Sequence, residues 1–113
     1  MYDAALDPIR ESEQAGYRPV VIVSRDALHR VLPIVIAFPS TTYQPGQRLY
    51  PSQVLLRAPD VGLDRDSVAL CEQVRALAKG RLARLRGVLH SRSMAQIERA
   101  LLIALDLPNP QEG

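Results

Sequence analysis

An arginine, a carboxylate and a hydroxyl stand beside strands that the sequence predicts, and together they could cleave a phosphodiester. Glu13 and Arg18 lie on or beside a polar turn that precedes an apolar run at 20–23, and Thr41 follows a second run at 34–38. Around the phosphate of RNA such a trio needs no metal, because the ribose 2′-OH is the nucleophile, a base removes its proton and the guanidinium neutralises the phosphorane. The same residues also fit an Arg–Glu pair that stabilises a hairpin, and the pattern alone does not separate the two alternatives.

Other polar side chains lie near the same predicted strand ends. A sheet could gather them into one patch beside the trio, where neighbouring Gln and Ser side chains can hydrogen-bond the base edges of single-stranded RNA. The members of this set are Gln14, Ser40, Thr42, Ser67, Glu72, Gln73 and Arg75.

The composition favours one soluble globular domain over residues 1–113. Close to half of the residues are apolar, and no apolar run reaches membrane-spanning length. Cys71 is the one cysteine, which excludes an internal disulfide and favours a cytosolic location. His29 and His90 have no Cys or His partner at ligand spacing, so neither a metal nor another cofactor is predicted.

The basic residues are nearly all arginine and are unevenly distributed. The chain carries no acidic residue between Arg75 and Arg92, although its formal net charge is only +2. Arginine forks bind phosphates and carboxylates, which suggests an anionic partner such as nucleic acid or an acidic peptide. A solvated face explains the run equally well, and charge alone does not decide between them.

Short apolar runs between turns predict a mostly β domain. The first predicted strand ends at Leu6-Asp7-Pro8. Five more are predicted at residues 20–24, 34–38, 53–57, 67–75 and 87–90. Asp26 is the predicted cap of a helical turn at 27–30, and a second short helix is predicted at 78–85. This order of elements, with a helix at the end, indicates a twisted, mostly antiparallel sheet or an SH3-like barrel.

The C-terminal segment gives the clearest helical pattern. Ser93 and Gln96 fit a capping box, and apolar residues from Met94 to Leu105 recur at helical spacing on one face. Pro108 ends the helix, and the tail 108–113 is predicted to fray.

Four blocks of sequence, in order and over nearly the whole chain, resemble the MazF/PemK family of bacterial toxins. The first block comprises residues 6–8 and residues 12–24. The second of these segments reads Ser-Glu-Gln-Ala-Gly-Tyr-Arg-Pro and continues into an apolar run. The others are 32–36 leading to Ser40–Thr41, then 66–75, and the Arg81–Leu82 step before the terminal helix. Members of this family are sequence-specific endoribonucleases of toxin–antitoxin pairs.

The resemblance implies an SH3-like barrel that works as a homodimer and cleaves single-stranded RNA without a metal, leaving a cyclic phosphate and a 5′-hydroxyl. It places Arg18 at the catalytic arginine, Thr41 at the residue that assists at the scissile phosphate, and Glu13 at the acidic residue of the same loop. Whether Glu13 or Arg18 takes the 2′-OH proton stays open, although an unperturbed arginine is a poor base. The residues expected to bind RNA are Gln14, Ser40, Ser67, Glu72, Gln73 and Arg75.

The expected partners are single-stranded RNA, a second copy of the chain and a cognate acidic antitoxin whose disordered tail occupies the RNA groove. The chain also departs from the family pattern. Its first strand is expected to be shortened, Glu11 stands where the family often has glycine, and Ala76 and Ala78 replace a Thr and an Asp. These departures keep open a second hypothesis, a non-catalytic or gyrase-directed binding protein on the same barrel, although retention of Arg18 and Thr41 favours cleavage.

Overall fold

The chain folds into an antiparallel sheet that one long helix covers. A computed structural model describes residues 1–5, 17–58 and 63–108. Its helices are α1 (Asp26–Val31) and α2 (Ser91–Ala104), with short 3₁₀ turns at η2 (Cys71–Gln73) and η3 (Lys79–Arg81). No helix in these ranges is long and apolar enough to cross a membrane. The strands are β1 (Tyr2–Ala5), β2 (Tyr17–Ile22), β3 (Ile34–Thr42), β4 (Gln53–Leu56), β5 (Ser67–Leu70), β6 (Arg75–Ala78) and β7 (Leu82–Leu85).

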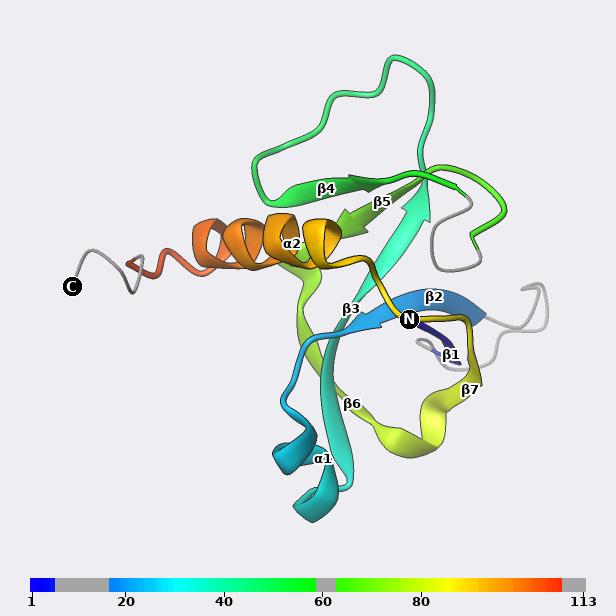
Figure 1. The fold of residues 1–113 in the computed structure, drawn as a ribbon, viewed down its shortest axis with the longest axis vertical. Coiled ribbons are helices and arrows are strands. Elements are labelled where there is room, and N and C mark those ends of the chain that lie inside the picture. The colour runs from blue at the N-terminus through cyan, green and yellow to red at the C-terminus, as the bar shows by residue number, and fades with distance from the viewer. Residues whose placement is uncertain (6–16, 59–62, 109–113) are drawn as a thin grey trace.

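The described strands form one sheet in the order β4-β5-β3-β2-β1-β7, and β6 also pairs with β3. Figure 1 shows β3 running through the middle of the molecule, with β4 and β5 toward one end, β6 alongside the other and α2 across the sheet. The prediction of a mainly β, antiparallel fold with a C-terminal helix is confirmed. Over the described strands the sheet is barrel-like but does not close.

Strand β3 is the longest and pairs along both edges, with β2 on one and with β5 and β6 on the other. Between the pairs Ala37↔Arg75 and Ser40↔Ala69, β3 advances three residues while the opposite segment advances six. The turn η2 takes up the difference. The single strand predicted at 67–75 is therefore wrong, because η2 divides it into two strands with different registers.

Side chains alternate between the two faces of the sheet along each strand, so the described residues form two buried clusters, one on each face. The larger lies under α2 and includes Phe38, Leu56 and Ile97. Val20 and Ala37 belong to the smaller cluster, although Ala37 is the sequence neighbour of Phe38, because successive side chains of a strand point to opposite faces. The two faces are called below the Phe38 face, which α2 covers, and the Val20 face.

Helix α2 begins earlier than its predicted capping box. His90 is the N-cap, and its Nδ1 accepts a hydrogen bond of 3.1 Å from the backbone N–H of Arg92. Ser93 and Gln96 lie inside the helix and so cannot cap it. The predicted apolar face is confirmed at Ile97, which is fully buried beneath the sheet.

Several predicted boundaries are wrong because strand pairing overrides local preference. Residues 78–85 favour a helix through Ala, Leu and Arg, but the chain there forms η3 and β7, and β7 pairs with β1. No strand forms at 87–90, and β3 continues through Pro39 to Thr42. Asp26 is the first residue of α1 rather than its cap. The strand end predicted at residues 6–8 lies outside the described residues.

The buried position of Leu56 predicts a large stability loss when its side chain is shortened. Leu56 is 1% exposed, whereas Leu85 on β7 is 57% exposed. Leu56→Ala should lower the free energy of unfolding by about 2–5 kcal/mol, since it opens a cavity in the larger cluster. Leu85→Ala, the matched control, should change it by less than about 1 kcal/mol. Urea unfolding of both variants measures the difference, and equal losses would contradict the assigned packing.

Candidate active site

The pairing of β2 with β3 ends two residues short of Arg18 and Thr41. Val20 pairs with Pro39, and Arg18 and Thr41 each lie two residues beyond that pair. Continued in the same register, the strands set Arg18 opposite Thr41 on the Val20 face. Directly opposed residues of antiparallel strands have Cβ atoms about 4.5–5.5 Å apart. The guanidinium and the hydroxyl can therefore reach one phosphate.

Arg18 lies within β2 rather than on the turn predicted to precede that strand. β2 begins at Tyr17, and Arg18 pairs with Ala4 of β1, so its backbone is held by a neighbouring strand. A residue held in a sheet presents its side chain more rigidly than a residue on a loop. Glu13 and Gln14, the other residues predicted from this stretch, lie outside the described residues.

Arg75 adds a second cation to the same face. It pairs with Ala37, whose side chain belongs to the Val20 face, and it is exposed. Thr41 lies four residues further along β3, which corresponds to about 13 Å in an extended strand. The Val20 face thus carries two arginines and a hydroxyl along the direction of β3.

The described part of the chain gives these three side chains no hydrogen-bond or ion-pair partner. Other arginines are already engaged. Arg84 and Arg86 pair with Asp3 at 3.1 and 2.7 Å, and Arg57 lies 3.8 Å from Asp66. The basic segment predicted from charge is therefore not a uniform cationic surface.

Ser40 and Ser67 were predicted to bind RNA, but the structure buries both side chains. Ser40 is 1% exposed, and its hydroxyl donates a 3.3 Å hydrogen bond to the carbonyl of Pro19. The Ser67 hydroxyl donates to the carbonyl of Arg65 at 3.0 Å. Ser40 pairs with Ala69 and lies on the Phe38 face. In this structure neither hydroxyl faces the surface that carries Arg18.

Glu72 and Gln73 lie in η2 and are exposed. The two carboxylate oxygens of Glu72 accept hydrogen bonds from Ser52 Oγ at 3.0 Å and from Gln53 Nε2 at 3.1 Å. These bonds turn Glu72 toward β4, whereas Arg75, two residues after η2, lies on the Val20 face. By strand register, Arg18, Thr41 and Arg75 therefore share the Val20 face, spread along β3, whereas Glu72 is directed elsewhere.

A separate Ser–His–Asp cluster follows the other end of β2. Ser24 Oγ lies 2.5 Å from His29 Nε2, and His29 Nδ1 lies 3.9 Å from Asp26 Oδ1. Ser24 Oγ also accepts a hydrogen bond from the backbone N–H of Ile36 at 2.9 Å. Asp26 is highly exposed and beyond hydrogen-bond distance. The geometry fits a structural link between β2 and β3 better than a catalytic triad.

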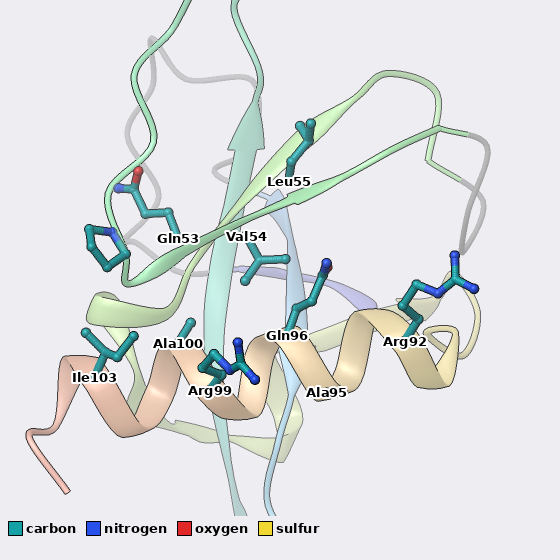
Figure 2. Close-up of a pocket in the computed structure, with 10 residues that line it drawn as sticks. Gln53, Val54, Leu55, Arg92, Ala95, Gln96, Arg99, Ala100 and Ile103 are labelled. Carbon is teal, nitrogen blue, oxygen red and sulfur yellow. The ribbon is translucent and has the colours of Figure 1, made fainter. Parts of the chain in front are cut away.

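The larger hollows of the structure lie away from Arg18 and Thr41. A groove of about 450 Å³ runs between β4 and α2, where Arg92, Arg99 and two glutamines line it (Figure 2). None of the residues predicted to cleave or bind RNA lines this groove. Arg18 and Thr41 are instead part of a sheet face, a shape suited to an extended chain rather than to an enclosed small molecule.

Cys71 cannot act as a nucleophile in this fold. It is fully buried in the larger cluster, and burial together with the neighbouring charge of Glu72 raises its pKa to about 12. A thiol with so high a pKa stays protonated at neutral pH. Among the residues that the structure describes, no three His, Cys, Asp or Glu side chains form a group that could hold a metal ion.

Comparison with known proteins assigns a family to this arrangement of strands. A sequence model described as "PemK-like, MazF-like toxin of type II toxin-antitoxin system" matches residues 1–105. The chain is also 36% identical over 107 residues to the endoribonuclease MazF of Staphylococcus saprophyticus, a match that covers 95% of this chain and 88% of that protein.

Solved structures show the same similarity. The Mycobacterium tuberculosis toxin MazF-mt6 superposes with a TM-score of 0.78 at 27% identity and covers 96% of this chain and 97% of its own. An endoribonuclease from a mycobacterial species, solved in complex with its cognate antitoxin, gives a TM-score of 0.76 at 28% identity, with 96% and 93% covered.

The buried thiol predicts a loss of stability at alkaline pH. The pKa of Cys71 rises from its ordinary value of 9.0 to about 12 on folding, so between these values the unfolded chain releases a proton that the folded chain keeps. The free energy of unfolding should therefore fall as pH rises from 9 toward 12. Urea unfolding at pH 8, 9 and 10 measures this slope. Cys71→Ala should flatten it, and an unchanged slope would refute the assignment.

Proposed function

The chain belongs to the PemK-like, MazF-like family of type II toxins, and from that membership we propose that this endoribonuclease cleaves single-stranded RNA at specific sequences without a metal ion. The observation that carries the proposal is the juxtaposition of Arg18 and Thr41 on the Val20 face. Both are free of partners among the described residues, and the register of β2 with β3, continued two residues past Val20↔Pro39, sets them opposite each other.

In the proposed reaction the ribose 2′-oxygen attacks the adjacent phosphorus. A bond forms between the 2′-oxygen and phosphorus and the bond from phosphorus to the 5′-oxygen breaks, which leaves a 2′,3′-cyclic phosphate and a 5′-hydroxyl. A base takes the 2′-OH proton, and a proton is delivered to the leaving 5′-oxygen.

Arg18 and Thr41 have distinct roles in this reaction. The Arg18 guanidinium stabilises the negative charge that grows on the non-bridging oxygens, and the Thr41 hydroxyl donates a hydrogen bond to one of them. Arginine keeps its proton at physiological pH, so the base is better sought elsewhere. We assign that place to Glu13, the carboxylate of the preceding segment, which lies outside the described residues.

The RNA chain extends along the Val20 face from this phosphate. Arg75, which shares the face and is exposed, binds a neighbouring phosphate through its fork. Gln73 is exposed beside it and Gln14 lies in the segment before Arg18, so both amides can hydrogen-bond base edges. Glu72 can hydrogen-bond a base only if its hydrogen bonds to Ser52 and Gln53 break.

The second proposed partner is a cognate antitoxin with an acidic segment. The similar mycobacterial endoribonuclease was solved with its cognate antitoxin. The Val20 face of this chain offers a carboxylate-rich peptide two arginines, Arg18 and Arg75, that have no partner among the described residues. An acidic peptide on these arginines would exclude RNA from the same surface, which inhibits cleavage. The working form in this proposal is a homodimer.

Arg18→Ala should lower the rate of RNA cleavage by about 10²–10³-fold without unfolding the protein, because it removes the cation at the transition state. Arg30→Ala is the matched control, since Arg30 is exposed on α1 at the opposite end of β2. Single-turnover cleavage and thermal unfolding of both variants test the role. Full activity of a folded Arg18→Ala protein would remove Arg18 from the mechanism.

The chemistry predicts products that do not depend on a metal. Cleavage should persist in EDTA, and the downstream fragments should accept a radioactive phosphate from polynucleotide kinase without prior dephosphorylation, because their 5′ ends are hydroxyls. A single 2′-deoxy nucleotide placed on the 5′ side of the cut should block the reaction. Loss of activity in EDTA or fragments with 5′-phosphates would exclude the proposed route.

A further inference from the structure

We propose that Ser40 is a positioning residue whose buried hydroxyl keeps Arg18 in register with Thr41. The inference rests on the proposed function, since it concerns the same pair of side chains. Ser40 precedes Thr41 on β3, and the atom that it binds, the carbonyl oxygen of Pro19, belongs to the residue that follows Arg18 on β2. This side-chain hydrogen bond thus joins the immediate neighbours of the two proposed catalytic residues.

Prolines weaken the backbone ladder at this point. Pro19 and Pro39 lie inside β2 and β3, both of which are central strands, where proline is unusual because it cannot donate a hydrogen bond. The recorded pairing of the two strands ends at Val20↔Pro39. In the continued register Pro19 lies opposite Ser40, and it has no N–H with which to return a bond to the Ser40 carbonyl.

The Ser40 hydroxyl supplies a hydrogen bond at the position where proline removes one. Its Oγ lies 3.3 Å from the Pro19 oxygen, and the residue is 1% exposed. A buried hydroxyl is costly unless it is bonded, so this bond is the favourable arrangement for Ser40. Without it, the end of β2 that carries Arg18 is held to β3 by fewer bonds, and the separation of Arg18 from Thr41 becomes variable.

The position of Ser40 excludes a direct role in binding RNA. Its side chain lies on the Phe38 face, opposite the face that carries Arg18 and Thr41. Ser40 therefore acts on the reaction through the backbone, and its loss should affect the rate of the chemical step more than the affinity for RNA. A displacement of about 1 Å in a catalytic group can cost 10²-fold in rate.

Ser24 provides a matched control at the other end of the same strand pair. It follows β2, and its hydroxyl accepts a hydrogen bond from the backbone N–H of Ile36 on β3 at 2.9 Å. Ser24→Ala thus removes a comparable hydroxyl link between the two segments, but at a distance from Arg18 and Thr41. If the hydroxyl hydrogen bond of Ser40 affects only stability, Ser40→Ala and Ser24→Ala should both lower the melting temperature and leave kcat unchanged.

The experiment compares the wild-type protein, Ser40→Ala, Ser24→Ala and Arg18→Ala in RNA cleavage and thermal unfolding. Ser40→Ala should lower kcat by about 10- to 100-fold and leave KM within about threefold of wild type. Ser24→Ala should lower the melting temperature and leave kcat unchanged. In the Arg18→Ala background the Ser40 substitution should have little further effect on the rate, because it acts through the placement of Arg18.

The outcomes separate this inference from the proposed function. If the wild-type protein does not cleave RNA, or if Arg18→Ala cleaves like wild type, the proposed function fails first. If both behave as expected but Ser40→Ala keeps a wild-type kcat, or lowers the rate equally with and without Arg18, the positioning role is wrong. Should Ser40→Ala not fold, Ser40→Cys replaces it, since a thiol keeps the volume but donates weakly, and the same loss of kcat is expected.

Discussion

The pairing of β3 along both of its edges determines where the side chains proposed for catalysis lie. β3 is the one strand that contacts β2, β5 and β6, so its register decides which residues share a face of the sheet. Because side chains alternate along a strand, a one-residue slip of β3 would move Thr41 to the face beneath α2 and away from Arg18. The core imposes the register, since Phe38 must be buried on one face and Ala37 on the other.

Ion pairs within the fold decide which of the many arginines can meet a ligand. Asp3 engages Arg84 and Arg86, so the charge of these two residues is used within the protein, near the first strand. Arg18 and Arg75 have no such partner among the described residues and share one face. An unpaired guanidinium close to a sheet attracts an anion more strongly than one that already binds a carboxylate. The small net charge of the chain therefore conceals a local cationic surface.

The shape of this surface agrees with a polymeric substrate. Two hollows of about 450 and 460 Å³ lie elsewhere, one between β4 and α2 and the other beside Met1 and Val21. The residues Arg18, Thr41 and Arg75 are spread along an extended strand direction. A nucleic-acid chain can bind across such a face through successive phosphates, whereas a small molecule binds best in a concavity that surrounds it. The geometry and the family membership thus support the same class of substrate.

The sequence by itself determined the residue types at the site, the apolar runs of β2 and β3, and the amphipathic helix α2, because each is encoded by neighbouring residues. Local pattern also placed Arg18 and Thr41 close to the ends of two strands. Only the tertiary structure decided that η2 divides the segment after Ser67, that residues 82–85 form a strand instead of a helix, and that Ser40 faces the core. Those outcomes depend on pairing between residues distant in sequence, which hydrophobic periodicity and helix propensity do not encode.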